Sequence, residues 1–314
     1  MSLDKENKVI ELEKKISELK EFSKKENINL TKEISILQDK VNVIKQEIYL
    51  NLTPWDKVKL SRLQARPTAL DYISNIFDTF IELHGDRTFA DDPSIIGGLA
   101  KFGDRVVTVI GQQKGKNTKE NIYRNFGMPH PEGYRKALRL MKQAQKFNRP
   151  IVCFIDTPGA FCGIGAEERC QGEAIAKNLF EMIALDVPII SIVIGEGGSG
   201  GALALSVSDE IWMLEHSVYS ILSPEGFASI LWKDSSKAEE ASKIMKITAQ
   251  DLEKYKILDR IIEEPLGGVH KDIKKCTQQI KTLLEETLTK LSSIDKTTLK
   301  LKRYEKYRSI GEVN

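Results

Sequence analysis

Residues 188–222 read PIISIVIGEGGSGGALALSVSDEIWMLEHSVYSIL and contain the pattern that decides the fold. An apolar strand is predicted over 188–194, and a short helix follows a glycine-rich loop and ends near Ser208. Two further strands are predicted over 210–214 and 218–222, with only a few residues between them. Parallel neighbours in one sheet need a crossover of a dozen or more residues. The pattern therefore excludes consecutive strands of a doubly wound sheet and favours a repeating β-β-α spiral.

The loop of this stretch offers its backbone as a binding surface. Glycine lets bare N–H groups approach a ligand, and the start of the following helix adds partial positive charge. Five glycines are crowded there, at positions Gly195, Gly197, Gly198, Gly200 and Gly201. We expect an anion, or a group that becomes anionic, to bind at this loop.

Three other interpretations of the loop are open from the motif alone. The spacing Gly195-x-Gly197-x-x-Gly200 matches a dinucleotide-binding pattern, with Glu215 as a ribose ligand. The two closely spaced strands that follow argue against it. A nucleophile elbow centred on Ser199 would need His216 or His270 as its base. A plain tight turn, in which the glycines only permit close packing, is the third.

Composition narrows the classes of function. The 314 residues are 29% charged with a net charge of only +2, so no global field marks a nucleic-acid binder. Neither a basic-then-apolar leader nor an apolar run of membrane-spanning length is present, and we expect a cytoplasmic protein without membrane association. The four cysteines form no C-x-x-C pair and the four histidines are dispersed, which predicts no metal site.

The N-terminal 50 residues contain no Gly or Pro and have apolar stripes at helical spacing. An interruption at 27–29 predicts two helices that fold back as a hairpin; the alternative is one solvated helix that pairs with another chain. A helix is expected from about Trp55 to Arg87, and strands from Gly97 onward.

A second strand-loop-helix unit precedes the first in the chain. Its strand is predicted over 150–155, its loop over 156–165 and its helix over 166–185. Another helix is predicted over 133–146, and we expect its basic face to be solvated. From about Lys271 the chain is again predicted to be helical, as a packing helix with a solvated basic end rather than a docking patch. The predicted units are a hairpin at 1–52, a central domain at 53–270 and a helical extension at 271–314.

Five motifs in order resemble those of one family. They are YI at 72–73 with FIELHGDR at 80–87, NFGMP at 125–129 with PEGYRKA at 131–137, DTPGA at 156–160, GEGGSGGALA at 195–204 and SPEG at 223–226. Together they resemble the carboxyltransferase α subunit of bacterial multi-subunit acetyl-CoA carboxylase, over nearly the whole chain. The resemblance implies an α/β, crotonase-like β-β-α spiral core with an N-terminal helical hairpin and a C-terminal helical tail.

The resemblance also implies an activity and its partners. A carboxyl group would pass from carboxybiotin, on a separate biotin carboxyl carrier protein, to acetyl-CoA to give malonyl-CoA for fatty acid synthesis. The family pairs α with a β subunit as α2β2; β has a zinc ribbon and most of the acyl-CoA site, while a separate biotin carboxylase consumes ATP. Both the biotin ureido oxygen and the thioester enolate become oxyanions, which preorganised N–H donors stabilise.

These implications assign roles to particular residues. The N–H groups of Gly200 and Gly201 are expected to form an oxyanion hole. Gly197 and Gly198 would shape its approach. Gly159 and Ala160 are expected to line the opposite wall, with Phe161 as an apolar cover. Weaker candidates for binding the CoA phosphates are Lys114, Lys116, Arg124 and Arg135. The rivals from other classes are a serine hydrolase that uses Ser199 and a non-catalytic assembly subunit.

Overall fold

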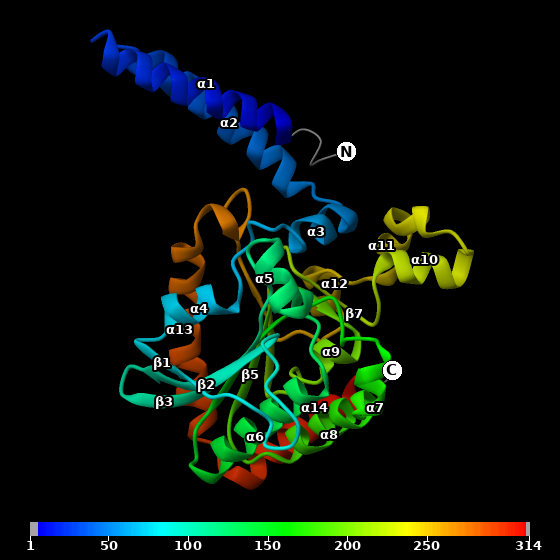
Figure 1. Cartoon of the computed structure of the whole chain (residues 1–314). Coiled ribbons are helices and arrows are strands. Elements are labelled where there is room, and N and C mark those ends of the chain that lie inside the picture. Colours follow the sequence, from blue (N-terminus) through cyan, green and yellow to red (C-terminus); the bar gives the residue numbers. More distant parts are fainter. Residues whose placement is uncertain (1–5, 312–314) are drawn as a thin grey trace.

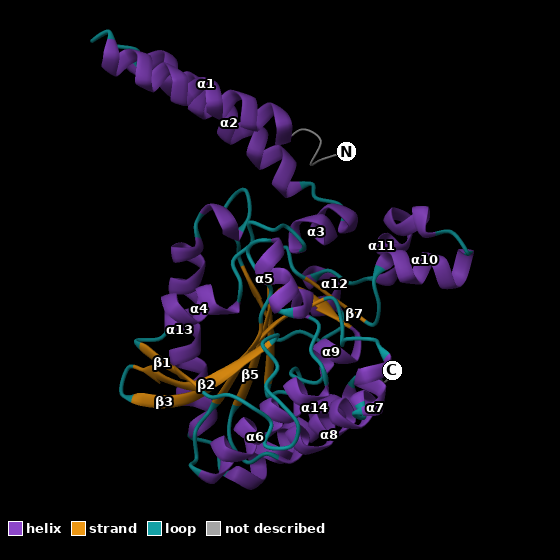
Figure 2. Ribbon diagram, in the orientation of Figure 1, coloured by secondary structure: helices purple, strands orange, loops and turns teal. Residues whose placement is uncertain are grey.

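The computed structural model describes residues 6–311. Its centre is a mixed sheet with the order β1-β2-β3-β4-β5-β6-β8, and β7 pairs with β5 beside that path (Figures 1 and 2). The strands β1 to β3 are antiparallel, and the pairs from β3 onward are parallel. Their bounds are β1 Thr79–Glu82, β2 Ile95–Phe102, β3 Arg105–Gln112, β4 Ile151–Thr157, β5 Ile189–Gly198, β6 Glu210–Leu214, β7 Val218–Ser220 and β8 Arg260–Ile262.

Helices cover both faces of the sheet (Figure 2). On one face, α4 (Ala69–Ile76) and α13 (Ile273–Ser292) share an apolar cluster with the strands. On the other face, α6 (Pro131–Lys146), α8 (Gln171–Ala184) and α9 (Ser199–Leu203) share a second cluster. Every residue of β4 and β5 is buried, as expected for strands covered on both sides.

Strand β5 explains how two closely spaced strands fit into one sheet. Its first half, at 190–193, pairs with β6, and its last residues, at 196–198, pair with β7. Both pairings are parallel. Strands β6 and β7 therefore pair with successive parts of the same strand, β5, and do not pair with each other as neighbouring strands. This arrangement confirms the predicted exclusion of a doubly wound sheet.

The predicted N-terminal hairpin is confirmed. Helices α1 (Glu6–Lys25) and α2 (Thr31–Leu50) pack against each other and project away from the sheet (Figure 1). Their buried side chains form a small separate cluster that reaches the body of the molecule through Leu60: Val9, Ile16, Val41, Ile48 and Tyr49.

The expectation of one helix from Trp55 to Arg87 is wrong. Helix α3 (Pro54–Ser61) ends before Pro67, α4 begins at Ala69, and the chain then forms β1. Proline at 67 removes a helical N–H and restricts the residue before it, which separates the two helices. Strand β1 pairs with β2 at the antiparallel edge, so strands begin well before Gly97.

Three other helices also differ from expectation. The segment 166–185 is split into α7 (Ile164–Glu168) and α8, because Cys170 takes a left-handed conformation with φ 63° between them. The helix after the glycine loop, α9, has five residues and ends at Leu203. In α6 the basic face is not wholly solvated: Lys136 is fully buried and its Nζ lies 2.6 Å from Asp91 Oδ1.

The C-terminal tail consists of α13 and α14 (Lys296–Ser309). Leu284, Leu288 and Leu291 of α13 are buried against the sheet, as their spacing predicts. The basic end of α14 is not simply solvated, because Arg303 is 1% exposed and its Nη2 donates to Asp209 Oδ2 at 2.7 Å. The division into units 1–52, 53–270 and 271–314 stays a prediction.

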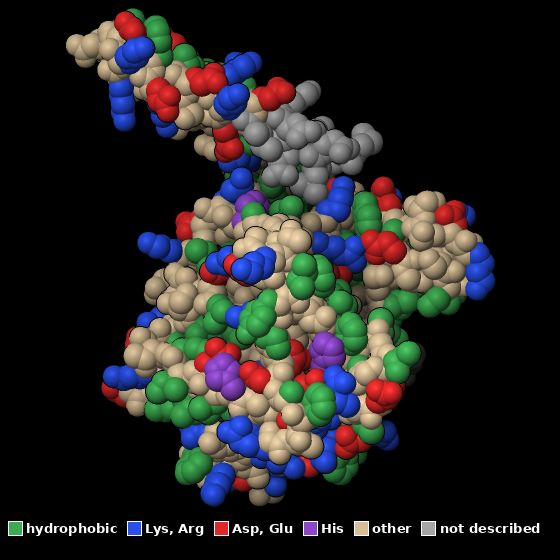
Figure 3. Space-filling view, viewed as in Figure 1, with side chains coloured by type: hydrophobic (Ala, Val, Ile, Leu, Met, Phe, Trp, Pro, Cys, Tyr) green, Lys and Arg blue, Asp and Glu red, His purple; other side chains and the backbone are tan. Residues whose placement is uncertain are grey.

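The remaining helices lie around the ends of the strands. Helices α10 and α11 form a lobe beside the body (Figure 1), and charged side chains of both signs are mixed over the face in Figure 3. Within residues 6–311, no helix has the length and apolar character needed to cross a bilayer. The bounds are α5 Thr118–Tyr123, α10 Pro224–Trp232, α11 Ala238–Met245 and α12 Ala249–Lys254.

Candidate active site

The loops that follow β4 and β5 press directly against each other. A Cβ atom on Gly198 would overlap the carbonyl oxygen of Pro158, and a Cβ on Gly201 would lie 2.5 Å from the backbone nitrogen of Ala160. These two positions therefore require glycine because another backbone occupies the space of a side chain. The two strand-loop-helix units seen in the sequence converge at one point.

A cleft of about 600 Å³ opens above this junction. The predicted site residues Gly159, Ala160, Gly200 and Gly201 line it together with Ser199. Gly197 and Gly198 do not line it; both are buried at the end of β5. The other residues of the lining are Arg62, Pro158, Ile175, Glu196, Leu222, Ser223 and Glu225.

The start of α9 lies at this cleft, where Ser199, Gly200 and Gly201 line it. The first turn of an α-helix has N–H groups without intrahelical acceptors, and the N-cap residue Gly198 provides no side-chain acceptor for them. Ser199 has a left-handed backbone with φ 56°, which turns the chain sharply from the strand into the helix. Gln112 Nε2 donates to the carbonyl oxygen of Gly201 at 2.7 Å and holds this turn from below.

Phe161 lies apart from the cleft lining. Its ring packs against His130 with the centroids 4.4 Å apart and the planes tilted by 32°, and its N–H donates to the carbonyl oxygen of Pro129 at 3.0 Å. These contacts connect the loop after β4 to the segment before α6. Phe161 does not line the cleft in this chain, and its role as a cover stays a prediction.

The four cationic candidates do not converge on one site. Lys114 pairs with Asp156 at 2.7 Å and Lys116 with Asp71 at 2.5 Å. Arg124 Nη1 donates to the carbonyl oxygen of Pro93 at 2.7 Å, and Arg135 Nε to Asp86 Oδ2 at 2.8 Å. Each of the four is thus held by a different partner within this chain.

Sequence patterns did not single out the charged wall of the cleft. Arg62 bridges Glu196 and Glu225, with Nε 2.9 Å from Glu196 Oε1 and Nη1 2.6 Å from Glu225 Oε1. Burial raises the pKa of the Glu225 carboxyl, but the hydrogen bond and charge of Arg62, together with hydrogen bonds from the start of α10, more than offset it, and the pKa is lowered. Both glutamates lie inside motifs quoted above, which could have identified them. Arg62 lies in no motif, and only the fold brings it here.

The arrangement around Ser199 does not form a hydrolase triad. Its candidate base His216 is buried and lines a separate cavity with Tyr49 and Glu264, where burial lowers the pKa of the imidazole. His270 lies in a turn before α13, next to Gly268. Among the described residues that line the cleft there is no histidine to act as a base.

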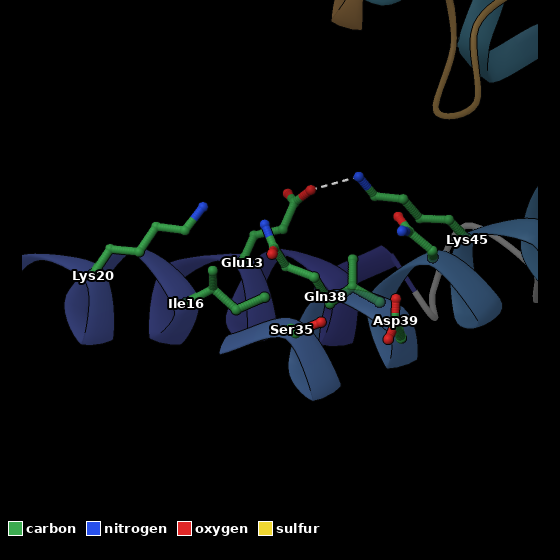
Figure 4. Close-up of a pocket in the computed structure, with 9 residues that line it drawn as sticks. Glu13, Ile16, Lys20, Ser35, Gln38, Asp39 and Lys45 are labelled. Carbon is green, nitrogen blue, oxygen red and sulfur yellow. Dashed lines mark hydrogen bonds and ion pairs between the residues drawn. The ribbon is translucent and has the colours of Figure 1, made fainter. Parts of the chain in front are cut away.

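Two further features of the molecule bear on its chemistry. In the described part of the chain, no group of three or more His, Cys, Asp or Glu side chains is placed to hold a metal ion. A second hollow of about 580 Å³ lies along the hairpin, where Glu13 of α1 and Lys45 of α2 form an ion pair (Figure 4). This hollow is lined by residues of the two projecting helices, whereas the cleft is lined mainly by residues of the loops that follow β4 and β5 and of the start of α10.

Comparison with known proteins identifies the family. The model of the family described as acetyl co-enzyme A carboxylase carboxyltransferase-like matches residues 2–311. The chain belongs to this carboxyltransferase family. It is 58% identical over 312 residues to the acetyl-coenzyme A carboxylase carboxyl transferase subunit alpha of Bacillus cytotoxicus, with 99% of this chain and 96% of that protein covered. The corresponding subunit of Geobacillus sp. is 58% identical over 310 residues, covering 99% and 95%.

Solved structures show the fold of the family. A Pseudomonas malonate decarboxylase hetero-tetramer in complex with coenzyme A matches with a TM-score of 0.61 at 14% identity, covering 77% of this chain and 97% of that chain. The transcarboxylase 12S hexamer core matches with a TM-score of 0.57 at 18% identity, covering 71% and 42%. The crotonase-like α/β fold is thus confirmed. The chain is a carboxyltransferase subunit of the acetyl-CoA carboxylase family.

Proposed function

We propose that this chain, as the α-type subunit of an acetyl-CoA carboxylase, transfers a carboxyl group from carboxybiotin on a separate carrier protein to acetyl-CoA. The product would be malonyl-CoA, the precursor for fatty acid synthesis, made in the cytoplasm. The observation that carries the proposal is the meeting of two glycine-containing loops at an open cleft in a family-matched chain. The relatives named above are themselves α subunits of this enzyme.

The cleft fits a group that gains negative charge. Bound carboxybiotin supplies an activated carboxyl group and a ureido oxygen on which charge develops when that group leaves. We assign the N–H groups of Gly200 and Gly201 as donors to such an oxyanion, since the first turn of α9 presents them without a capping side chain. Gly159 and Ala160 form the facing wall, and Gly197, Gly198 and Phe161 hold the two loops in place.

The cleft of one chain is open, and we propose that a β-type subunit completes it in an α2β2 assembly. That subunit would contain the zinc ribbon and most of the acyl-CoA site, while the biotin carboxyl carrier protein and biotin carboxylase supply the carboxybiotin. A contribution of Lys114, Lys116, Arg124 or Arg135 to the CoA phosphates stays a weaker part of the proposal, because each already has a partner in this chain.

Position 200 allows a clean test of the backbone donors. A Cβ atom on Gly200 would meet only Ile175, at 3.5 Å, which is ordinary contact. Gly200→Pro removes the N–H in the first turn of α9, and Gly200→Ala keeps it. Because proline at 200 also disfavours the left-handed backbone of Ser199, the two variants are compared only after both are shown to fold and assemble. In the assembled complex we expect Gly200→Pro to lower kcat about 100-fold or more, with KM changed far less, and Gly200→Ala to stay within about threefold.

Equal activities of the two variants would contradict the oxyanion role of this N–H. Circular dichroism and size-exclusion chromatography establish first that both variants fold and assemble. Ser199→Ala in the same assay separates the hydrolase alternative, since loss of a covalent nucleophile costs several orders of magnitude. We expect that variant to stay within about tenfold of the parent.

A further inference from the structure

One guanidinium connects three separate segments at the wall of the cleft. Arg62 follows the last residue of α3, and its side chain is 30% exposed. It holds Glu196 at the end of β5 through Nε and Nη2, and Glu225 in the first turn of α10 through Nη1 and Nη2. Arg62 therefore links the first turn of α10 to the end of β5, in addition to the packing of α11 against α3.

The two carboxylates held by Arg62 have different surroundings. The Glu196 side chain is 10% exposed, and its backbone N–H donates to Asp156 Oδ1 at 3.0 Å. The same oxygen accepts from Lys114 Nζ at 2.7 Å, so Glu196 is fixed to the end of β4. The Glu225 side chain is 39% exposed and stands on the lobe formed by α10 and α11. The ion pair between Arg62 and Glu196 is thus fixed to the sheet. The ion pair between Arg62 and Glu225 connects the lobe of α10 and α11 to it.

Arg62 and Glu196 also separate two spaces. Both line the cleft and both line an inner cavity of about 210 Å³, which contains Lys114 and Asp156 at its wall. Among the described residues that line the cleft, Arg62 has the only positive charge, against the negative charges of Glu196 and Glu225. Without the guanidinium, the carboxylates of Glu196 and Glu225 would face an anionic ligand in the cleft with no positive charge between them. The side chain that separates the cleft from the inner cavity would also be lost.

We propose that Arg62 is a positioning residue for the biotin side of the carboxyl-transfer site. It fixes the distance between the glycine loop and the first turn of α10, and it neutralises the two glutamates that would otherwise repel the carboxylated ring. The inference rests on the proposed function, because it needs that ring to bind in this cleft. The proposed role of Arg62 is in binding the biotin ring, with or without its carboxyl group. Arg62 is not expected to affect the acyl-CoA site.

The test compares two substrates in one reaction. Carboxyl transfer from malonyl-CoA to free biotin is measured in the assembled complex of Arg62→Met and of Arg105→Met. Arg105 is a matched control, since it is also partly exposed and paired with a glutamate, Glu285, at 3.3 Å, but it lies outside the cleft lining. We expect Arg62→Met to raise KM for biotin about tenfold or more and KM for malonyl-CoA less than about twofold, with Arg105→Met near the parent in both.

Two more variants keep the test decisive where Arg62→Met assembles poorly. Arg62→Lys keeps the charge but cannot hold two carboxylates in a fork, and it should recover only part of the affinity for biotin. Glu225→Gln weakens the outer pair alone and should raise KM for biotin about threefold. Because both act through one contact, the double variant Arg62→Met with Glu225→Gln should be no worse than Arg62→Met.

An equal rise of both KM values, or an unchanged KM for biotin with a lower melting temperature, would overturn the positioning role and leave Arg62 a structural residue. Failure of the proposed function has a different signature: the unmodified complex would transfer no carboxyl group to biotin, and Gly200→Pro would match Gly200→Ala. In that case this inference fails with it.

Discussion

The N-terminal hairpin and the β4–β5 centre both bury apolar side chains, but they do so at different scales. The hairpin has a small cluster between two helices and exposes Phe22, Ile36 and Val43 at 50%, 55% and 54%. Strands β4 and β5 are buried along their whole length between two layers of helices. Burial of apolar area is the main source of stability, so the two regions should respond very differently to the same kind of substitution.

The largest effect is expected in the centre. Phe154 of β4 is fully buried and stacks on Tyr72 with the ring centroids 5.8 Å apart. Phe154→Ala removes this contact and creates a cavity, and we expect the free energy of unfolding to fall by about 3–5 kcal/mol. Chemical denaturation followed by tryptophan fluorescence measures the change.

The matched variant in the hairpin is Val41→Ala. Val41 is 4% exposed, but its neighbours belong to the separate hairpin cluster. We expect the main unfolding transition to stay in place while amide exchange in α1 and α2 becomes faster. If both variants shifted the main transition equally, the hairpin and the centre would unfold as one cooperative unit, and the comparison would be wrong.

The next effect tests whether the C-terminal helix belongs with the centre. Arg303 of α14 donates to Asp209 and to the carbonyl oxygens of Met182, Leu185 and Val187. Arg303→Met leaves these acceptors buried without their donor, and we expect a loss of about 3 kcal/mol. This figure is at the lower end for a broken buried pair, because Asp209 still accepts from the N–H of Ile189.

Lys302→Met is the control for Arg303→Met, since Lys302 is exposed on the same helix. Its unfolding free energy should stay within about 0.5 kcal/mol of the parent. Thermal and chemical unfolding of both variants measures the difference between their unfolding free energies. Equal small effects would mean that α14 is peripheral, like the hairpin.

The smallest effect is expected from removing most of the hairpin. Deletion of residues 1–45 keeps Ile48 and Tyr49, which are buried, with only 2% and 8% of their surface exposed. We expect the melting temperature of the remaining protein to change by no more than about 4 °C, which corresponds to about 1 kcal/mol for a domain of this size. Assembly with a β-type subunit should weaken, because the exposed apolar side chains of the hairpin are then lost; light scattering of the mixture measures this. A large loss of stability would show that the hairpin is part of the core.

The elements that were predicted well are those with a complete local pattern. The hairpin helices and the beginnings of the apolar strands β4 and β5 appear in the structure where the sequence places them, although β5 continues to Gly198, four residues into the predicted loop. The segment 55–87 failed because its helical periodicity continues through Pro67 and gives no sign that Thr79–Glu82 will pair with β2. Pairing of an edge strand depends on a partner sixteen or more residues away, which no local window contains.

The same division holds for the candidate site and for the protein as a whole. The sequence by itself determined the glycine loop, the tandem strand-loop-helix units and, through five ordered motifs, the carboxyltransferase family, because these features are written in neighbouring residues. Only the tertiary structure decided that the loop at Pro158 fills the space beside Gly198, that Phe161 packs against His130 and that Lys114 is held by Asp156. It also placed Arg62 between Glu196 and Glu225, residues 134 and 163 positions away in the chain. Such contacts depend on how the sheet and its helices pack, and a side chain's charge or shape acquires its role only from the groups that packing brings within a few ångströms of it.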